Sequence, residues 1–304
     1  MIVNALIRAI LPFSEKELIF LITYWNHDFS YLLSLKMITN QLKRFVETQS
    51  ISEGFIAVLK DFLQCKTLKE NDFSPYADSI SIIERILINH SGICFEDGTP
   101  LFLLLPDPFG DFVNQTITEY PDDKRDAFSM IAKVFSKETK ITTAKEAISI
   151  VKSLEYTMES EALKSCIRLI LENASRFTPR TKEIQIGQGT YGIQYYIDYE
   201  PMRRENIMII KGLVLLAGHY KIRSAITPIQ KLAERSYIQR STNVIGPGAR
   251  ILGNCCIHVL AHHFGNRGHG ALHELYEFTT YKSIRTQIEK ESAILEQNTG
   301  TPLL

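Results

Sequence analysis

Apolar residues at helical spacing, repeated in paired segments, constrain the fold of this chain more than any other feature. Two helix pairs are predicted in succession, over residues 203–221 and 224–240 and then over residues 248–264 and 268–282. The break Ile245-Gly246-Pro247-Gly248 joins the pairs, and a charged helix over residues 283–297 follows them. Short connections place consecutive helices antiparallel, and a long succession of such pairs buries its apolar faces by stacking. The pattern therefore predicts an all-α protein whose C-terminal part is an armadillo/HEAT-like α-solenoid.

The whole chain divides into five regions by this reading. Residues 1–90 are an N-terminal helical region, and the Pro- and Gly-rich residues 91–121 are an irregular connection and the best domain boundary. Residues 122–181 are middle helices. Residues 182–201 alternate, are rich in Tyr and contain Gly, which favours a β-hairpin-like or loop insertion. Residues 202–304 hold the HEAT-like helix pairs.

Two capping boxes mark expected helix starts. Ser14 and Glu17 have the required spacing, as do Thr143 and Glu146. In each box, the hydroxyl of the first residue accepts a hydrogen bond from a backbone N–H. The Glu carboxylate reaches back to accept a hydrogen bond from the backbone N–H of that first residue. In the Pro/Gly-rich connection, Asp107 stands between two prolines and is assigned a turn role rather than a catalytic one.

Composition excludes several classes of protein. Hydrophobic residues make up 45% and charged residues 22% of the chain, the balance of a folded protein rather than a disordered one. The 34 basic and 34 acidic residues cancel, which argues against nucleic-acid binding driven by overall charge. The apolar N-terminus lacks the preceding basic region of a signal peptide, and no apolar run is long enough for a membrane span. The five cysteines show no disulfide framework, so we expect reduced thiols and a cytoplasmic protein.

A glycine motif in the aromatic-rich segment invites a nucleotide-binding interpretation. Gly187, Gly189 and Gly192 match G-x-G-x-x-G, and Lys211 follows as a candidate phosphate partner. The catalytic and metal-binding motifs of a protein kinase do not follow, and residues 195–199 do not resemble the helix of a dinucleotide-binding fold. We therefore favour a Gly-rich hairpin turn.

A cluster of Cys and His is the sharpest chemical hypothesis in the chain. Cys255, His258 and His262 share one helical face, and His273 (or His269) on the following helix would complete a tetrahedral Zn²⁺ site. The spacing matches neither H-E-x-x-H nor a common structural zinc pattern. The favoured interpretation places these residues on the inner face and last turn of a packed helix, without a metal. Zinc is the cofactor of the alternative interpretation.

Basic residues gather between positions 203 and 250, with Tyr interleaved. The candidate nucleic-acid contacts are Arg203, Arg204, Lys221, Arg223, Lys231, Arg235 and Arg240. Nearby acidic residues offset part of this charge, so a solvated helix face is the favoured interpretation.

Particular motifs in residues 203–297 resemble the MolR-like bacterial proteins, an uncharacterised family with HEAT-like helical repeats whose longer members often carry a WGR domain. These motifs are Ile210-Lys211-Gly212-Leu213-Val214, Gly246-Pro247-Gly248, Leu252-Gly253-Asn254-Cys255, Tyr281-Lys282-Ser283-Ile284-Arg285 and Ile288-Glu289-Lys290. The resemblance covers about a third of the chain. It implies a helical-repeat fold, and it implies no catalytic residues.

The leading functional expectation is a non-catalytic scaffold that binds another protein on a concave solenoid surface. A metal-binding protein or enzyme centred on residues 255–273 is the second expectation. A nucleic-acid binder using the basic face of residues 203–250 is the third. Membrane binding is not expected.

Overall fold

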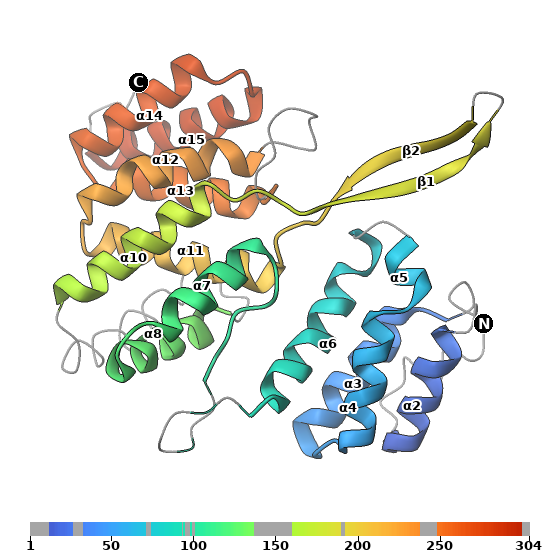
Figure 1. Ribbon diagram of the computed structural model, residues 1–304. Coiled ribbons are helices and arrows are strands. Elements are labelled where there is room, and N and C mark those ends of the chain that lie inside the picture. Colours follow the sequence, from blue (N-terminus) through green and yellow to red (C-terminus); the bar gives the residue numbers. More distant parts are fainter. Residues whose placement is uncertain are drawn as a thin grey trace. The chain divides into compact units, whose positions relative to one another are not determined.

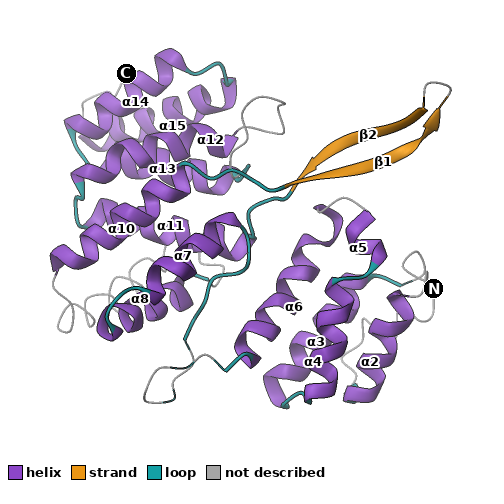
Figure 2. Cartoon of the chain, in the orientation of Figure 1, coloured by secondary structure: helices purple, strands orange, loops and turns teal. Residues whose placement is uncertain are grey.

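The computed structural model describes residues 12–26, 33–70, 74–92, 94, 98, 101–136, 160–189, 192–237 and 248–299. These residues are mostly helical and include one two-stranded antiparallel sheet (Figures 1 and 2). The chain divides into two compact units. Unit 1 contains Met1–Cys94 and Arg180–Arg203, and unit 2 contains Phe95–Pro179 and Arg204–Leu304.

Unit 1 is a helical bundle followed, much later in the chain, by the hairpin. Its elements are α2 (Glu15–Tyr24), α3 (Leu35–Thr48), α4 (Glu53–Leu63), α5 (Lys66–Glu70), η2 (Ser74–Tyr76), α6 (Ala77–His90), β1 (Thr181–Gly189) and β2 (Gly192–Tyr199). Helices α3 and α4 each pack against both α2 and α6. The core contains Trp25, whose indole N–H donates to the carbonyl of Leu33 at 2.9 Å. Burying an indole is favourable here because its one donor is satisfied.

Over the residues that the structure describes, every regular element of unit 2 is a helix. Its helices are α7 (Pro108–Thr118), α8 (Asp122–Phe135), α10 (Ser160–Ser175), α11 (Arg204–His219), η4 (Arg223–Ala225), α12 (Ile226–Tyr237), α13 (Arg250–His263), α14 (Asn266–Phe278) and α15 (Lys282–Thr299). From α10 onward each helix packs against the next but one: α10 on α12, α11 on α13, α12 on α14 and α13 on α15. Helix α11 is apolar on all sides and almost entirely buried, as expected of a central helix. The prediction of helices throughout residues 203–297 is confirmed for the residues described.

The predicted hairpin is present. Strands β1 and β2 pair antiparallel from Thr181 opposite Tyr199 to Gly189 opposite Gly192. The pairing shifts between Gln185 and Gly187, so β1 carries a bulge. The G-x-G-x-x-G motif therefore lies at the hairpin end, where the interpretation as a hairpin turn placed it, and not before a helix.

The irregular connection predicted over residues 91–121 is wrong in part, because α7 occupies its second half. Asp107 is the N-cap of this helix, and its carboxylate accepts from the N–H of Gly110 at 2.8 Å. Pro108 stands at the first helical position, where its missing N–H has no cost. The Pro and Gly residues thus begin a helix here rather than only interrupting one.

The first capping box is confirmed, and the second lies outside the described residues. The Ser14 hydroxyl accepts from the N–H of Glu17, while the N–H of Ser14 donates to the Glu17 carboxylate at 2.7 Å. This arrangement places the pKa of Glu17 below its ordinary value through hydrogen bonds from Ser14. Among the described helices, none combines the length and apolar character that crossing a bilayer requires.

Candidate functional site

Helix α13 carries the candidate site because it is packed on several sides. It contacts α11, α12, α14 and α15. Cys255, Cys256 and Val259 of α13 are buried, whereas His258 and His262 are half-buried. Residues four apart on a helix lie one above the other, so the two imidazoles form one column on α13. Their ring centroids are 4.6 Å apart.

A carboxylate from α15 meets this column. One oxygen of Glu291 (Oε2) lies 3.1 Å from Nδ1 of His258 and 2.9 Å from Nε2 of His262. The other oxygen (Oε1) accepts a hydrogen bond from the Gln287 side chain at 3.0 Å. Only 8% of the Glu291 side chain is exposed, against 33% for His258 and 19% for His262. We call these three residues the His–Glu cluster.

The environment of the His–Glu cluster acts on its carboxylate in two directions. Burial raises the pKa of Glu291, but the hydrogen bonds and charges of His258 and His262 together outweigh it and place that pKa below its ordinary value. Opposite charges and hydrogen bonds to the ionised form are the expected cause of such a shift. Glu291 is therefore ionised near neutral pH.

A third histidine lies nearby without joining the cluster. Burial is the main cause that lowers the pKa of His263, and neighbouring positive groups, His258 and His262 first among them, add to it. His263 sits against the helix crossing with α11, since a Cβ on Gly218 would lie 3.1 Å from its side chain. Its position is that of a packing residue.

The structure separates the other two predicted zinc ligands from the cluster. The thiol of Cys255 lies 3.8 Å from the carbonyl of Lys211 on α11, and burial raises its pKa to about 12. Zinc binds thiolate, so this thiol is a poor ligand. His273 is exposed on α14. His269, the other candidate for the fourth position, lies 2.9 Å from the carbonyl of Ala261 through Nε2. Cys255 therefore faces α11, although it shares a helical face with His258 by spacing alone.

Glu291 is the residue that the sequence reading missed. It lies 29 positions after His262, in a helix that also contains Glu289 and Glu296. No local pattern distinguishes it from these neighbours. Only the packing of α15 on α13 brings it to the histidines.

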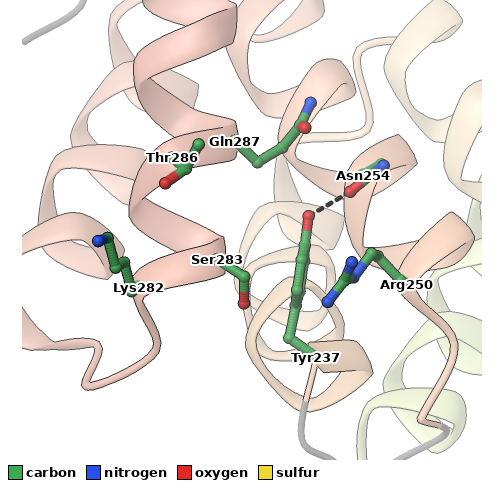
Figure 3. A pocket seen from close by; sticks show the side chains of 7 residues that line it. All are labelled: Tyr237, Arg250, Asn254, Lys282, Ser283, Thr286 and Gln287. Carbon is green, nitrogen blue, oxygen red and sulfur yellow. Dashed lines mark hydrogen bonds between the residues drawn. The ribbon is translucent and has the colours of Figure 1, made fainter.

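An open groove of about 620 Å³ lies along the same pair of helices (Figure 3). Its lining comes from three helices: Tyr237 of α12, Arg250 and Asn254 of α13, and Lys282, Ser283, Thr286 and Gln287 of α15. Tyr237 donates to the Asn254 side chain, and burial raises the pKa of its hydroxyl to about 12. Gln287 also contacts Glu291, and Asn254 lies one helical turn before His258. One lining residue, Gln287, thus connects the groove to the His–Glu cluster.

The predicted basic face is broken up by structural roles. Arg203 is buried in unit 1, where it forms ion pairs with Glu84 at 2.8 Å and Glu200 at 3.0 Å. Arg235 is half-buried in unit 2 and donates to the carbonyls of Ser175 and Phe177 at the end of α10. Arg204, Lys221, Arg223 and Lys231 are exposed, and Arg240 lies outside the described residues. A nucleic-acid backbone would therefore lose two of the contacts that the sequence suggested.

The hairpin presents an apolar surface. Ile193, Tyr195 and Ile197 alternate along β2 and so share one face, and they are 49%, 54% and 53% exposed. We call them the β2 apolar face. On the opposite face of the hairpin, Ile184 and Asp198 are buried. Exposed apolar side chains are normal one at a time, but three in a row on one face are informative.

Comparisons with family models, with curated proteins and with solved structures gave no match for this chain.

Proposed function

We propose that this chain is a non-catalytic helical-repeat protein that binds another protein through the β2 apolar face. The observation that carries the proposal is the exposure of Ile193, Tyr195 and Ile197 along one strand. Tyr and β-branched residues provide much contact area with little loss of conformational freedom, which suits them to a binding surface.

The form of the hairpin adds to this argument. A two-stranded hairpin is marginally stable in water by itself, because it has few apolar residues to bury. Within the described part of the chain the sheet has only these two strands, so each has an outer edge with no neighbouring strand. A partner that covers the β2 apolar face or adds a strand at an edge would supply both apolar contacts and hydrogen bonds.

The helices of unit 2 support the helical-repeat part of the proposal. Contacts between each helix and the next but one, from α10 to α15, are the contacts expected when antiparallel pairs stack as in armadillo and HEAT proteins. The resemblance of residues 203–297 to MolR-like bacterial proteins is in agreement. The five cysteines are free thiols, which suits the proposed cytoplasmic location.

Affinity capture with matched variants tests the proposal. The wild-type chain, expressed in its own host, is expected to retain one protein in stoichiometric amount. Replacing Ile193, Tyr195 and Ile197 by Thr keeps β-propensity and removes the apolar surface, so the partner should be lost. Phe278→Ser is the control: it removes an apolar side chain that is 81% exposed on α14, and it should not change retention of the partner.

Two results would count against the proposal. One is a wild-type chain that retains no stoichiometric protein. The other is equal retention by the wild type and the Thr variant, which would place the interaction away from β2.

A further inference from the structure

We propose that His258, His262 and Glu291 bind a divalent transition-metal ion, with Zn²⁺ the ion that these ligands suit best. One ligand atom from each residue can be chosen such that all three lie within 4.8 Å of one another. Two imidazoles and one carboxylate are a donor set that zinc accepts, with three protein ligands and a fourth position for water or another molecule. This inference is independent of the proposed partner binding.

The direction of the contacts agrees with a shared ion. Both imidazoles approach the same carboxylate oxygen, Oε2 of Glu291, at 3.1 and 2.9 Å. Ligand atoms around one zinc ion are about 2.0–2.2 Å from the metal. A small separation of these side chains would therefore place an ion between Oε2 and the two imidazole nitrogens that it now contacts.

A neighbouring residue holds the carboxylate in place. Gln287 lies one turn before Glu291 on α15 and donates to Oε1 at 3.0 Å. This hydrogen bond leaves Oε2 directed at the histidines. Gln287 is therefore a positioning residue, in the way that groups behind metal ligands commonly orient them.

Burial and access are also suitable. The carboxylate is buried at the contact between α13 and α15, so its charge is poorly solvated and would be neutralised by a cation. The imidazoles are 33% and 19% exposed, which leaves a path for the ion. These properties distinguish the cluster from a solvated surface ion pair.

The same contacts also describe a hydrogen-bonded trio that only fastens α15 to α13. Metal uptake separates the two roles. Tag-free, full-length chain is treated with EDTA, dialysed and titrated with ZnCl₂ by calorimetry. Co²⁺ is added in parallel, because its visible absorption reports the number and type of ligands. The expected result is one ion per chain, with the absorption of a four-coordinate site.

The variants identify the ligands. His262→Gln and Glu291→Gln should each weaken zinc binding by more than tenfold, and Gln287→Ala by roughly 10–100-fold. Cys255→Ser and His273→Gln are matched controls that should bind as the wild type does. Circular dichroism reports whether each variant folds. If Glu291→Gln does not fold, His258→Gln, at the most exposed of the three positions, is the second ligand variant. No stoichiometric uptake by the wild type would overturn the proposal. Zinc affinity equal to that of the wild type in the folded His262→Gln and His258→Gln variants would also overturn it.

Discussion

At the scale of single residues, Gly212 shows how closely two helices of unit 2 approach. A Cβ at this position on α11 would lie 2.1 Å from the ring of Phe135 on α8. No real Cβ atom tolerates that distance, so the Phe135 ring or one of the two helices would have to shift. The glycine is required by packing and not by a turn, which matches its place within a buried helix.

Gly212→Ala is therefore expected to lower the free energy of unfolding by about 1–3 kcal/mol through overpacking. Gly270→Ala is the control, because nothing lies within 4 Å of a Cβ there. In the middle of α14 this change should raise stability by roughly 0.5–1 kcal/mol, since alanine favours the helix. Urea unfolding of both variants measures the difference. Equal effects would show that α11 and α8 are not packed as described.

The carboxylate of Glu291 gives a pH prediction at the same scale. Its pKa is lowered in the folded protein, since the two histidines outweigh the effect of burial. The unfolded chain therefore binds the proton more readily, and the ionised carboxylate stabilises the fold above its ordinary pKa of 4.5. That contribution is lost as pH falls through the lower folded value.

Urea unfolding in EDTA, from about pH 7 down to about pH 3.5, checks this sign. The stability difference between wild type and Glu291→Gln should be largest at the upper end and shrink below about pH 4.5. A difference that grows as the solution becomes more acidic would contradict the arrangement of the His–Glu cluster.

Residue-level features with a local cause were predictable from sequence, and those with a distant cause were not. Ser14 and Glu17 lie within one helical turn, so their spacing alone predicted the cap. Glu291 meets His258 across two helices, and nothing in its own neighbourhood indicates this. The zinc hypothesis therefore had two of the cluster's three residues, and it added Cys255 by helix spacing and His273 from the following helix.

At the scale of elements, the extended segment before α7 is held by side chains in place of a neighbouring strand. Asn114 exchanges two hydrogen bonds with the backbone of Leu104, at 2.8 and 3.0 Å. Asn206 does the same for Leu105, at 3.2 and 2.9 Å, and also donates to Asp107. Buried backbone groups require such partners, which explains why a polar Asn stands in the apolar helix α11.

Asn206→Ala would leave the buried N–H of Leu105 without this acceptor. We expect a loss of about 1–3 kcal/mol in the free energy of unfolding, from that group alone. Asn298→Ala, at an exposed position on α15, should have almost no effect. Calorimetric unfolding of the two variants compares them, and similar midpoints would mean that Asn206 does not hold the segment.

In unit 1, Arg203 joins α6 to the chain that leaves the hairpin. It forms two hydrogen bonds with Glu84, at 3.0 and 2.8 Å, and an ion pair with Glu200. All three side chains are buried. Charge alone suggested a nucleic-acid contact, but the partners of Arg203 are far away in sequence and were not visible there.

Arg203→Ala is expected to destabilise the protein by about 3–5 kcal/mol, because the buried carboxylates of Glu84 and Glu200 would lose a positively charged partner. Arg223→Ala, which removes the same side chain from an exposed position, should change stability by less than about 0.5 kcal/mol. Comparable losses in urea unfolding would place Arg203 on the surface and contradict the buried ion pairs.

At the scale of the whole molecule, the sequence did not indicate which distant segments pack into the same unit. Alternation and Gly predicted the hairpin correctly, because strand periodicity is local. From its position in the sequence, the hairpin was predicted to be an insertion next to the C-terminal helices. In the structure, residues 180–203 group instead with the first 94 residues. Such a return of the chain depends on long-range contacts, including the bond from Lys182 to the carbonyl of Leu68 at 3.1 Å.

The β2 apolar face is the surface on which the proposed function depends, and photo-crosslinking tests it most directly. The photoreactive residue p-benzoylphenylalanine is placed at position 195 in one variant and at position 278 in another, and both are irradiated in host cells. Position 195 should give a single crosslinked product with one partner protein, and position 278 should not. Absence of a product from position 195, or the same product from both positions, would contradict partner binding through the hairpin.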